Sequence, residues 1–110
     1  MRYKEITQKD LKYIEEVFCG DAPAFRNSAG ARSDVQVSPI EGKFIQMIVK
    51  MINAKHVLEI GAMHGYSTSW ILSALPNDGE LLSIEKSRDA YNIAIGNIGE
   101  DRRANILNAD

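Results

Sequence analysis

The chain has 110 residues and a formal net charge of −2, and its length is that of one domain at most. Its composition, 45% hydrophobic and 25% charged, is typical of a soluble globular protein. No apolar run approaches the ~20 residues of a membrane span, and no secretion signal is recognisable. The single cysteine excludes an internal disulfide and a multi-cysteine zinc site. We therefore expect a reduced, cytoplasmic protein without a membrane segment or a strong nucleic-acid surface.

The first 37 residues predict one helix and a long loop. Thr7, with Asp10 three residues later, is typical of a helix start, and Gly20 of a helix end. Residues 20–37 then contain many turn-forming residues and no apolar period. A loop of this length is typical of a functional lid or a partly disordered segment, so residues 1–37 are interpreted as an N-terminal helix and lid-like loop.

Residues 38–110 predict alternating helices and strands. The expected helices cover residues 39–52, 66–75 and 88–98, and the expected strands cover 56–60, 81–85 and 104–108. This order is typical of a parallel sheet with helical crossovers. Because doubly wound sheets usually carry about five to seven strands, three strands predict the N-terminal half of a domain. We expect an open strand edge and one poorly covered sheet face.

Several apolar residues of the predicted helices are candidates for the core. An apolar stripe at spacings of three and four runs along residues 39–52, and it consists of Ile40, Phe44, Met47, Ile48, Met51 and Ile52. We expect this stripe to fill the core. Cys19 is expected in the core or in a subunit contact, and Trp70 is expected to pack against the sheet.

One expected strand is joined to the following helix by the segment 59–68, EIGAMHGYST. Gly61 and Gly65 permit positive φ angles and close approach of a ligand, and the first amides of the helix favour a polar or anionic group. Glu85 ends the next strand about 20 residues after Gly65, the spacing at which a carboxylate accepts hydrogen bonds from ribose hydroxyls. The pattern predicts a nucleoside ligand, although a plain tight turn would use the same glycines.

Two residues of this segment indicate which nucleoside is bound. The turn is G-x-x-x-G, with Met63 at the place where the middle glycine of a dinucleotide fingerprint admits a pyrophosphate. Glu59 directly precedes the turn, where its carboxylate would repel a pyrophosphate and attract the ammonium group of an amino acid. S-adenosylmethionine therefore fits the turn better than NAD. His64, inside the turn, is either a ligand contact or an ordinary turn residue.

Five linked segments carry a family resemblance: SPIEGKF at 38–44, AKHVLEIG at 54–61, GYST at 65–68, ALPNDG at 74–79 and IE at 84–85. Over about residues 35–110 the chain resembles the cation-dependent O-methyltransferases of the caffeoyl-CoA and catechol type, which include bacterial members acting on tRNA wobble uridine derivatives. The resemblance implies an α/β, Rossmann-like fold of seven strands, of which this chain holds the first three. It also implies S-adenosylmethionine as cofactor, Mg²⁺ or a similar divalent cation, and a homodimer.

The resemblance assigns cofactor-binding roles by position. Glu59 and Gly61-Ala62 would line the methionine end, and Ser67 would bond the methionine carboxylate. Glu85 would hold the ribose hydroxyls. The backbone of Val37 would touch the cofactor. Asp110 would lie near the adenine, although Asn108-Ala109-Asp110 departs from the Gly-Asp-Ala segment of the family.

The metal-binding aspartates and asparagine of the family, and a lysine near the reacting oxygen, match no residue of this chain. The catalytic residues are therefore expected beyond Asp110, and no metal ligand is assigned. We expect the cofactor-binding portion of an O-methyltransferase whose acceptor is a small phenol, an acyl-CoA ester or a modified tRNA base. By itself the 110-residue chain is expected to be inactive. The alternatives are a non-catalytic nucleoside-binding or interaction module and an NAD-dependent oxidoreductase.

Overall fold

The computed structural model describes residues 5–22 and 36–110. The helical elements are α1 (Gln8–Tyr13), the π-helical segment η1 (Ile14–Phe18), α2 (Pro39–Met51), α3 (Tyr66–Ala74) and α4 (Arg88–Ile98). The strands are β1 (His56–Ile60), β2 (Glu80–Glu85) and β3 (Ala104–Asn108). The order of elements agrees with the prediction. Residues 23–35, most of the predicted lid-like loop, lie outside the described residues.

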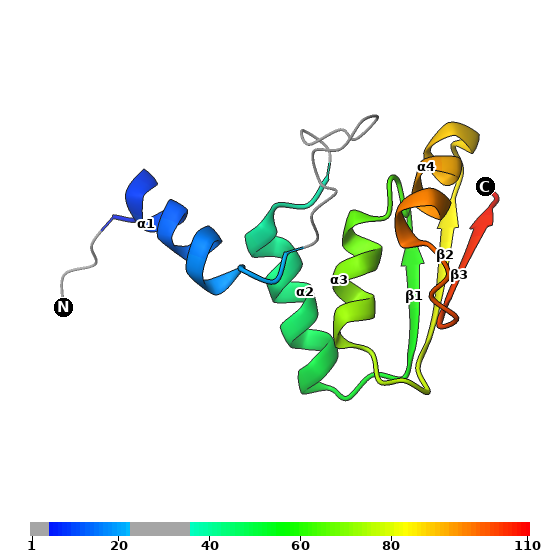
Figure 1. The fold of residues 1–110 in the computed structure, drawn as a ribbon, viewed down its shortest axis with the longest axis horizontal. Helices are drawn as coiled ribbons and strands as arrows, with labels where there is room; N and C mark the ends of the chain where they lie inside the picture. Colours follow the sequence, from blue (N-terminus) through cyan, green and yellow to red (C-terminus); the bar gives the residue numbers. More distant parts are fainter. Residues whose placement is uncertain (1–4, 23–35) are drawn as a thin grey trace.

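The three strands form one parallel sheet in the order β1-β2-β3. In this register Glu59 lies opposite Ser83, and Ser83 lies opposite Ile106. Helices α2, α3 and α4 lie on the same side of the sheet (Figure 1). Parallel strands that alternate with helices confirm the predicted α/β class, with the three strands that the sequence indicated.

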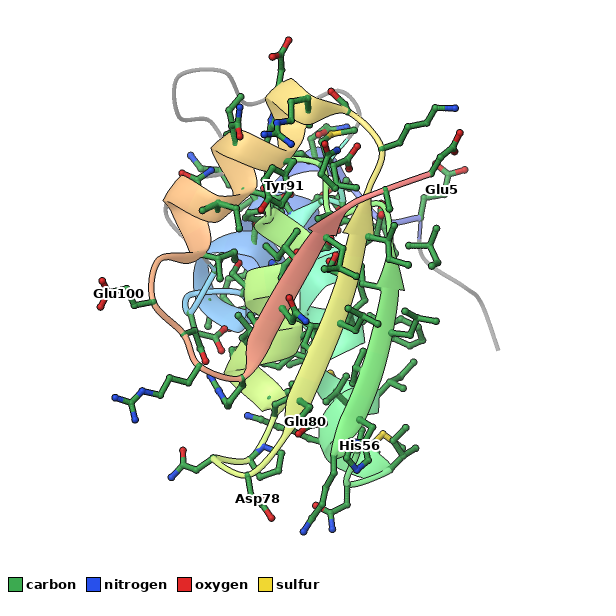
Figure 2. The ribbon with its side chains drawn as sticks, turned by 90° about the vertical axis from the view of Figure 1, so that its right-hand side faces the viewer. Glu5, His56, Asp78, Glu80, Tyr91 and Glu100 are labelled. Atoms are coloured by element: carbon green, nitrogen blue, oxygen red, sulfur yellow. The ribbon has the colours of Figure 1, made fainter. Side chains whose placement is uncertain are left out.

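The other face of the sheet is uncovered by any described helix (Figure 2). Leu58 and Ile60 of β1 are 61% and 74% exposed on this face, and Leu107 of β3 is 42% exposed. Such residues are normally buried when both faces of a parallel sheet carry helices. The prediction of a poorly covered sheet face is confirmed. None of the described helices is long and apolar enough to cross a lipid bilayer.

Helix α2 buries a different face from the one predicted. The residues that it buries are Gly42, Gln46 and Val49, at spacings of four and three, and this face packs against α3. The predicted stripe is wrong as a core face, because Phe44 and Met51 are 63% and 79% exposed. Apolar periodicity could not reveal the buried face, since a glycine and a glutamine occupy two of its three positions.

Trp70 lies on α3 and is fully buried, but it faces α2 and the N-terminal segment rather than the sheet. Its ring meets the ring of Tyr66 edge to face, with 6.5 Å between centroids. Cys19 is buried in the same cluster, which confirms its prediction as a core residue, and burial raises the pKa of its thiol. The contact of Trp70 with the sheet was therefore predicted wrongly.

The N-terminal helix begins as predicted. Thr7 accepts a hydrogen bond from the backbone amide of Asp10, and the Asp10 carboxylate accepts one from the amide of Thr7. The helix then changes to π geometry at Ile14. Tyr13 and Val17 are 65% and 61% exposed, so much of the apolar surface of this helix is not covered by the described residues.

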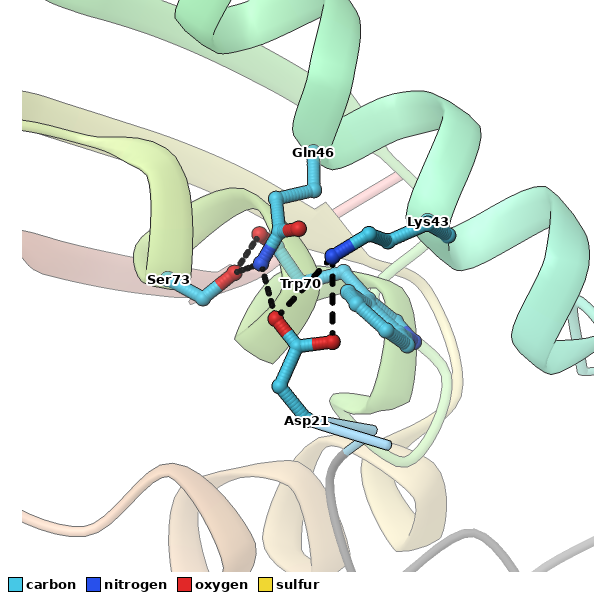
Figure 3. A network of polar contacts seen from close by, with 5 residues as sticks. All are labelled: Asp21, Lys43, Gln46, Trp70 and Ser73. Atoms are coloured by element: carbon cyan, nitrogen blue, oxygen red, sulfur yellow. Dashed lines mark hydrogen bonds and ion pairs between the residues drawn. The ribbon is translucent and has the colours of Figure 1, made fainter. Parts of the chain in front are cut away.

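A polar network joins the segment after η1 to α2 and α3 (Figure 3). The Asp21 carboxylate accepts from Gln46 Nε2 at 2.9 Å and from Lys43 Nζ at 3.2 Å. Gln46 Nε2 also donates to Ser73 Oγ at 2.8 Å, so one buried amide bridges two segments. The Gln46 hydrogen bond, with Lys43 beside it, lowers the pKa of Asp21.

This lowered pKa predicts a pH-dependent contribution to the free energy of unfolding. A carboxyl group whose pKa is lower in the folded state stabilises the protein above its unfolded pKa, and the contribution is lost as pH falls through the folded pKa. Because Asp21 is about half exposed, we expect less than about 1 kcal/mol. Unfolding curves recorded by fluorescence of the single tryptophan, Trp70, should show a smaller loss between about pH 5 and pH 2 in Asp21→Asn than in the wild type. Equal losses in both proteins would contradict this role of Asp21.

Candidate functional site

The turn after β1 combines three residues with positive φ. Gly61 and Gly65 have φ angles of 90° and 87°, and Met63 has 49°. A Cβ atom on Gly61 would meet nothing within 4 Å, so conformation rather than space favours glycine there. On Gly65 it would lie 3.1 Å from Cγ1 of Ile98. The amide of Gly61 donates to the carbonyl of Ile84 at 2.7 Å, which ties the turn to β2.

Glu85, the last residue of β2, is buried against this turn. Its Oε2 accepts from the amide of Met63 at 2.6 Å, and its Oε1 accepts from the amide of Ser87 at 2.8 Å. The side chain of Asn108 donates to the Glu85 carbonyl at 2.8 Å. A carboxylate offers about four acceptor positions, so this fixed group can accept further hydrogen bonds from ligand hydroxyls.

Glu59 lies on β1 on the helix-covered face of the sheet, and its half-buried carboxylate accepts from three hydroxyl groups. Ser67 donates to Oε2 at 2.7 Å, Thr68 donates to Oε1 at 2.5 Å, and Ser83 donates to Oε1 at 2.7 Å. Within residues 5–22 and 36–110, no basic side chain forms an ion pair with Glu59. A carboxylate that has only neutral partners is suited to a cationic ligand group.

Cavities surround the glycine turn. One of about 110 Å³ is lined by Gln36, Val37, Gly61, Ala62, Met63, Tyr66 and Ser67. A second, of about 370 Å³, is lined by Met63, His64, Glu85, Ser87, Asp89, Ala90 and Ile93. A third, of about 260 Å³, includes Gly61, Glu85 and Asp110. Each pair of these cavities shares one lining residue, which is Gly61, Met63 or Glu85, so all three cavities lie around the carboxyl ends of β1 and β2.

The structure brings most of the predicted site residues together. Val37, Gly61, Ala62 and Ser67 share the first cavity, although Val37 is 24 or more positions away from the others in sequence. Glu85 and Asp110 line the third cavity. Gly65 is the N-cap residue of α3 and has a left-handed conformation, so it offers no side chain to cap the helix.

Asp110 and Glu59 are less clearly connected with the cavities than the other predicted residues. The Asp110 carboxylate lies 3.1 Å from Lys86 Nζ, and both side chains are strongly exposed, so this ion pair contributes little to stability. Glu59 is not among the residues that line the first cavity. It is linked to the cavity by Ser67, which lines the cavity and donates a hydrogen bond to Glu59.

Sequence reasoning missed several lining residues. Tyr66 is adjacent in sequence to the predicted Ser67, and Ser87 and Asp89 closely follow the predicted Glu85. Their closeness in sequence to predicted residues could have identified them. Gln36 had no such signal apart from its neighbour Val37. His64, which the sequence predicts as either a ligand contact or an ordinary turn residue, was not missed: it is 5% exposed and lines the second cavity. Its backbone carbonyl accepts from Asn97 Nδ2 at 2.9 Å.

The fold and the site together define an α/β protein whose cavities lie at the carboxyl ends of parallel strands, the edge at which open α/β sheets generally bind ligands. The family model described as O-methyltransferase matches residues 21–108. The chain therefore belongs to this O-methyltransferase family, as the sequence resemblance indicated.

Individual relatives agree with this membership. Caffeoyl-CoA O-methyltransferase of Populus kitakamiensis is 42% identical over 60% of this chain and 28% of its own length. Catechol O-methyltransferase of Niastella koreensis is 45% identical over 46% of this chain and 23% of its own length. The solved O-methyltransferase of Bacillus cereus, in complex with SAH (S-adenosylhomocysteine), is 28% identical with a TM-score of 0.75, over 88% of this chain and 48% of that one.

The matches also define how much of a Rossmann-like methyltransferase this chain contains. It spans about half of the solved structure and less than a third of these two curated relatives. Its three-stranded sheet and the helices on one face therefore match about half of the fold of the solved structure.

Proposed function

We propose that this chain is the cofactor-binding portion of an S-adenosylmethionine-dependent methyltransferase that transfers a methyl group to a hydroxyl oxygen. The observation that carries the proposal is the pair of carboxylates on either side of the glycine turn. Glu59 faces three hydroxyl donors and no basic side chain of the described residues, which suits an ammonium group. Glu85 is held by two backbone amides beside the turn, which suits ribose hydroxyls.

The cofactor fits the order of these groups along the sheet edge. Val37, Gly61, Ala62 and Ser67 would hold the methionine end in the first cavity. Glu85 would accept from the ribose hydroxyls, and the cavity that includes Asp110 would take part of the nucleoside. When bound, S-adenosylmethionine supplies an electrophilic methyl group on its sulfonium. The residues of this chain bind and orient that group, which lowers the entropic part of the barrier to an in-line displacement.

The family resemblance implies a divalent cation near the reacting oxygen. Among the described residues, no three side chains of His, Cys, Asp or Glu gather where they could hold a metal ion. The described residues therefore do not provide the cluster of carboxylate donors with which proteins commonly hold a hard cation.

The proposal extends to the methyl acceptor, the oligomeric state and the location of the protein. The names of the relatives point to small molecules with hydroxyl groups, and we propose a small phenol, an acyl-CoA ester or a modified tRNA base. A homodimer is supported by the exposed apolar side chains of α2, which are Phe44, Met47, Ile48, Met51 and Ile52. A cytoplasmic location is consistent with the single cysteine and the mixed charges.

The cofactor assignment predicts selective stabilisation of the full-length protein by S-adenosylhomocysteine. A ligand that binds only the folded state, present at ten times its dissociation constant, should raise the free energy of unfolding by about 1.4 kcal/mol. The midpoint of thermal unfolding, recorded with and without ligand, gives the shift. NAD at the same concentration should leave the midpoint unchanged, because Met63 occupies the turn and Glu59 would repel a pyrophosphate.

Stabilisation by NAD without stabilisation by S-adenosylhomocysteine would indicate an oxidoreductase instead. If S-adenosylhomocysteine binds but the full-length protein transfers no labelled methyl group to any phenol, acyl-CoA ester or tRNA tested, the non-catalytic nucleoside-binding alternative gains support.

A further inference from the structure

Two fully buried hydroxyl groups meet on one oxygen of Glu59. Thr68 and Ser83 are both 0% exposed, and both donate to Oε1, at 2.5 Å and 2.7 Å. Ser83 stands directly opposite Glu59 in the register of β1 and β2, and Thr68 lies in the first turn of α3. One donor therefore comes from the sheet and the other from the helix above it.

The two oxygens of Glu59 have different surroundings. Oε1 is occupied by the two buried hydroxyls, whereas Oε2 accepts only from Ser67 among the described residues. Ser67 also lines the cavity of about 110 Å³ together with Val37 and Ala62. The carboxylate is thus anchored on one side and directed toward the cavity on the other.

We infer that Thr68 and Ser83 are positioning residues that fix Glu59 for recognition of the ammonium group of the cofactor. The inference rests on the proposed function and extends it to two residues that do not line the first cavity. If either donor is removed, the Glu59 side chain is held less firmly. Part of the free energy of ligand binding would then be spent on ordering this side chain. A buried serine at the centre of β2, between Leu82 and Ile84, is otherwise unexpected in a strand of this kind.

The test compares two ligands that share the nucleoside. S-adenosylhomocysteine carries the amino-acid group, and 5′-methylthioadenosine lacks it. Calorimetry on the folded full-length protein should give a preference ratio for the first ligand in the wild type. Ser83→Ala should reduce this ratio about three- to tenfold, because part of the binding free energy is then spent on ordering the Glu59 side chain. The affinity for 5′-methylthioadenosine should stay unchanged, because that ligand does not use Glu59.

Thr68→Val provides an independent second variant, because it keeps the shape of the side chain and removes the hydroxyl. The same reduction of the ratio is expected for it. Ser69→Ala is the matched control: Ser69 lies on the same helix, and its hydroxyl donates to the carbonyl of Tyr66 instead of to Glu59. This control should leave the ratio unchanged.

The outcomes separate this inference from the proposed function. If the folded variants lose affinity for both ligands equally, or for neither, the hydroxyls are structural and the inference is overturned. If the wild type shows no preference for S-adenosylhomocysteine over 5′-methylthioadenosine, Glu59 does not recognise the amino-acid group and the inference fails with that assignment. If the wild type binds neither ligand, the proposed function itself is wrong.

Discussion

Replacement of Glu85 by alanine should weaken the binding of S-adenosylhomocysteine by about 1.5–3 kcal/mol, or roughly 10- to 150-fold. The substitution removes the charged acceptor that we assign to the ribose hydroxyls. It also leaves the amides of Met63 and Ser87 without the carboxylate that holds the turn. Glu85→Asp should lose less, because the charge remains and only the reach is shortened. Calorimetry on folded protein measures both losses.

A pair of nucleosides distinguishes the ribose contact from a general loosening of the turn. The wild type should bind adenosine more tightly than 2′,3′-dideoxyadenosine, which lacks the two hydroxyls. In Glu85→Ala this difference should disappear, because the acceptor for those hydroxyls is absent. A difference that persists in the variant would show that Glu85 is a structural residue at the end of β2.

Substitution of Gly42 by alanine should lower the free energy of unfolding by about 2–3 kcal/mol, near the upper end of the usual range for overpacking. A Cβ atom at this position would lie 2.1 Å from Nε1 and 2.3 Å from Cδ1 of Trp70. Since α2 and α3 are in contact here, either the indole or a whole helix must move. This cost exceeds the gain of about 1 kcal/mol that alanine offers over glycine inside a helix. Chemical denaturation, followed by the fluorescence of Trp70, measures the net effect.

Gly96→Ala is the matched control for this substitution. Gly96 lies in α4, is exposed, and would place its Cβ in open space with no atom within 4 Å. The same change should therefore raise the free energy of unfolding by about 0.5–1 kcal/mol. If Gly42→Ala also stabilised the protein, α2 would not be packed on the Trp70 ring as described.

The sequence alone determined the order of helices and strands, the parallel class of the sheet, and the glycine turn and Glu85 as parts of the candidate site. The cap at Thr7, the glycine turn and the spacing to Glu85 act through neighbouring residues, so they are readable without knowledge of distant contacts. The parallel order of the three strands followed from their alternation with helices. The uncovered sheet face followed from the small number of strands, because three strands and their connections cannot cover both faces.

Only the tertiary structure decided which helix faces are buried and how the two carboxylates are held. The inner face of α2 holds Gly42 and Gln46, and it is buried because Trp70 and the Asp21 network meet it from other segments. Apolar periodicity measures the composition of one helix and contains no information about its partner. In the same way, Ser83 became part of the Glu59 site only through the register of β1 and β2, which places two residues far apart in sequence side by side.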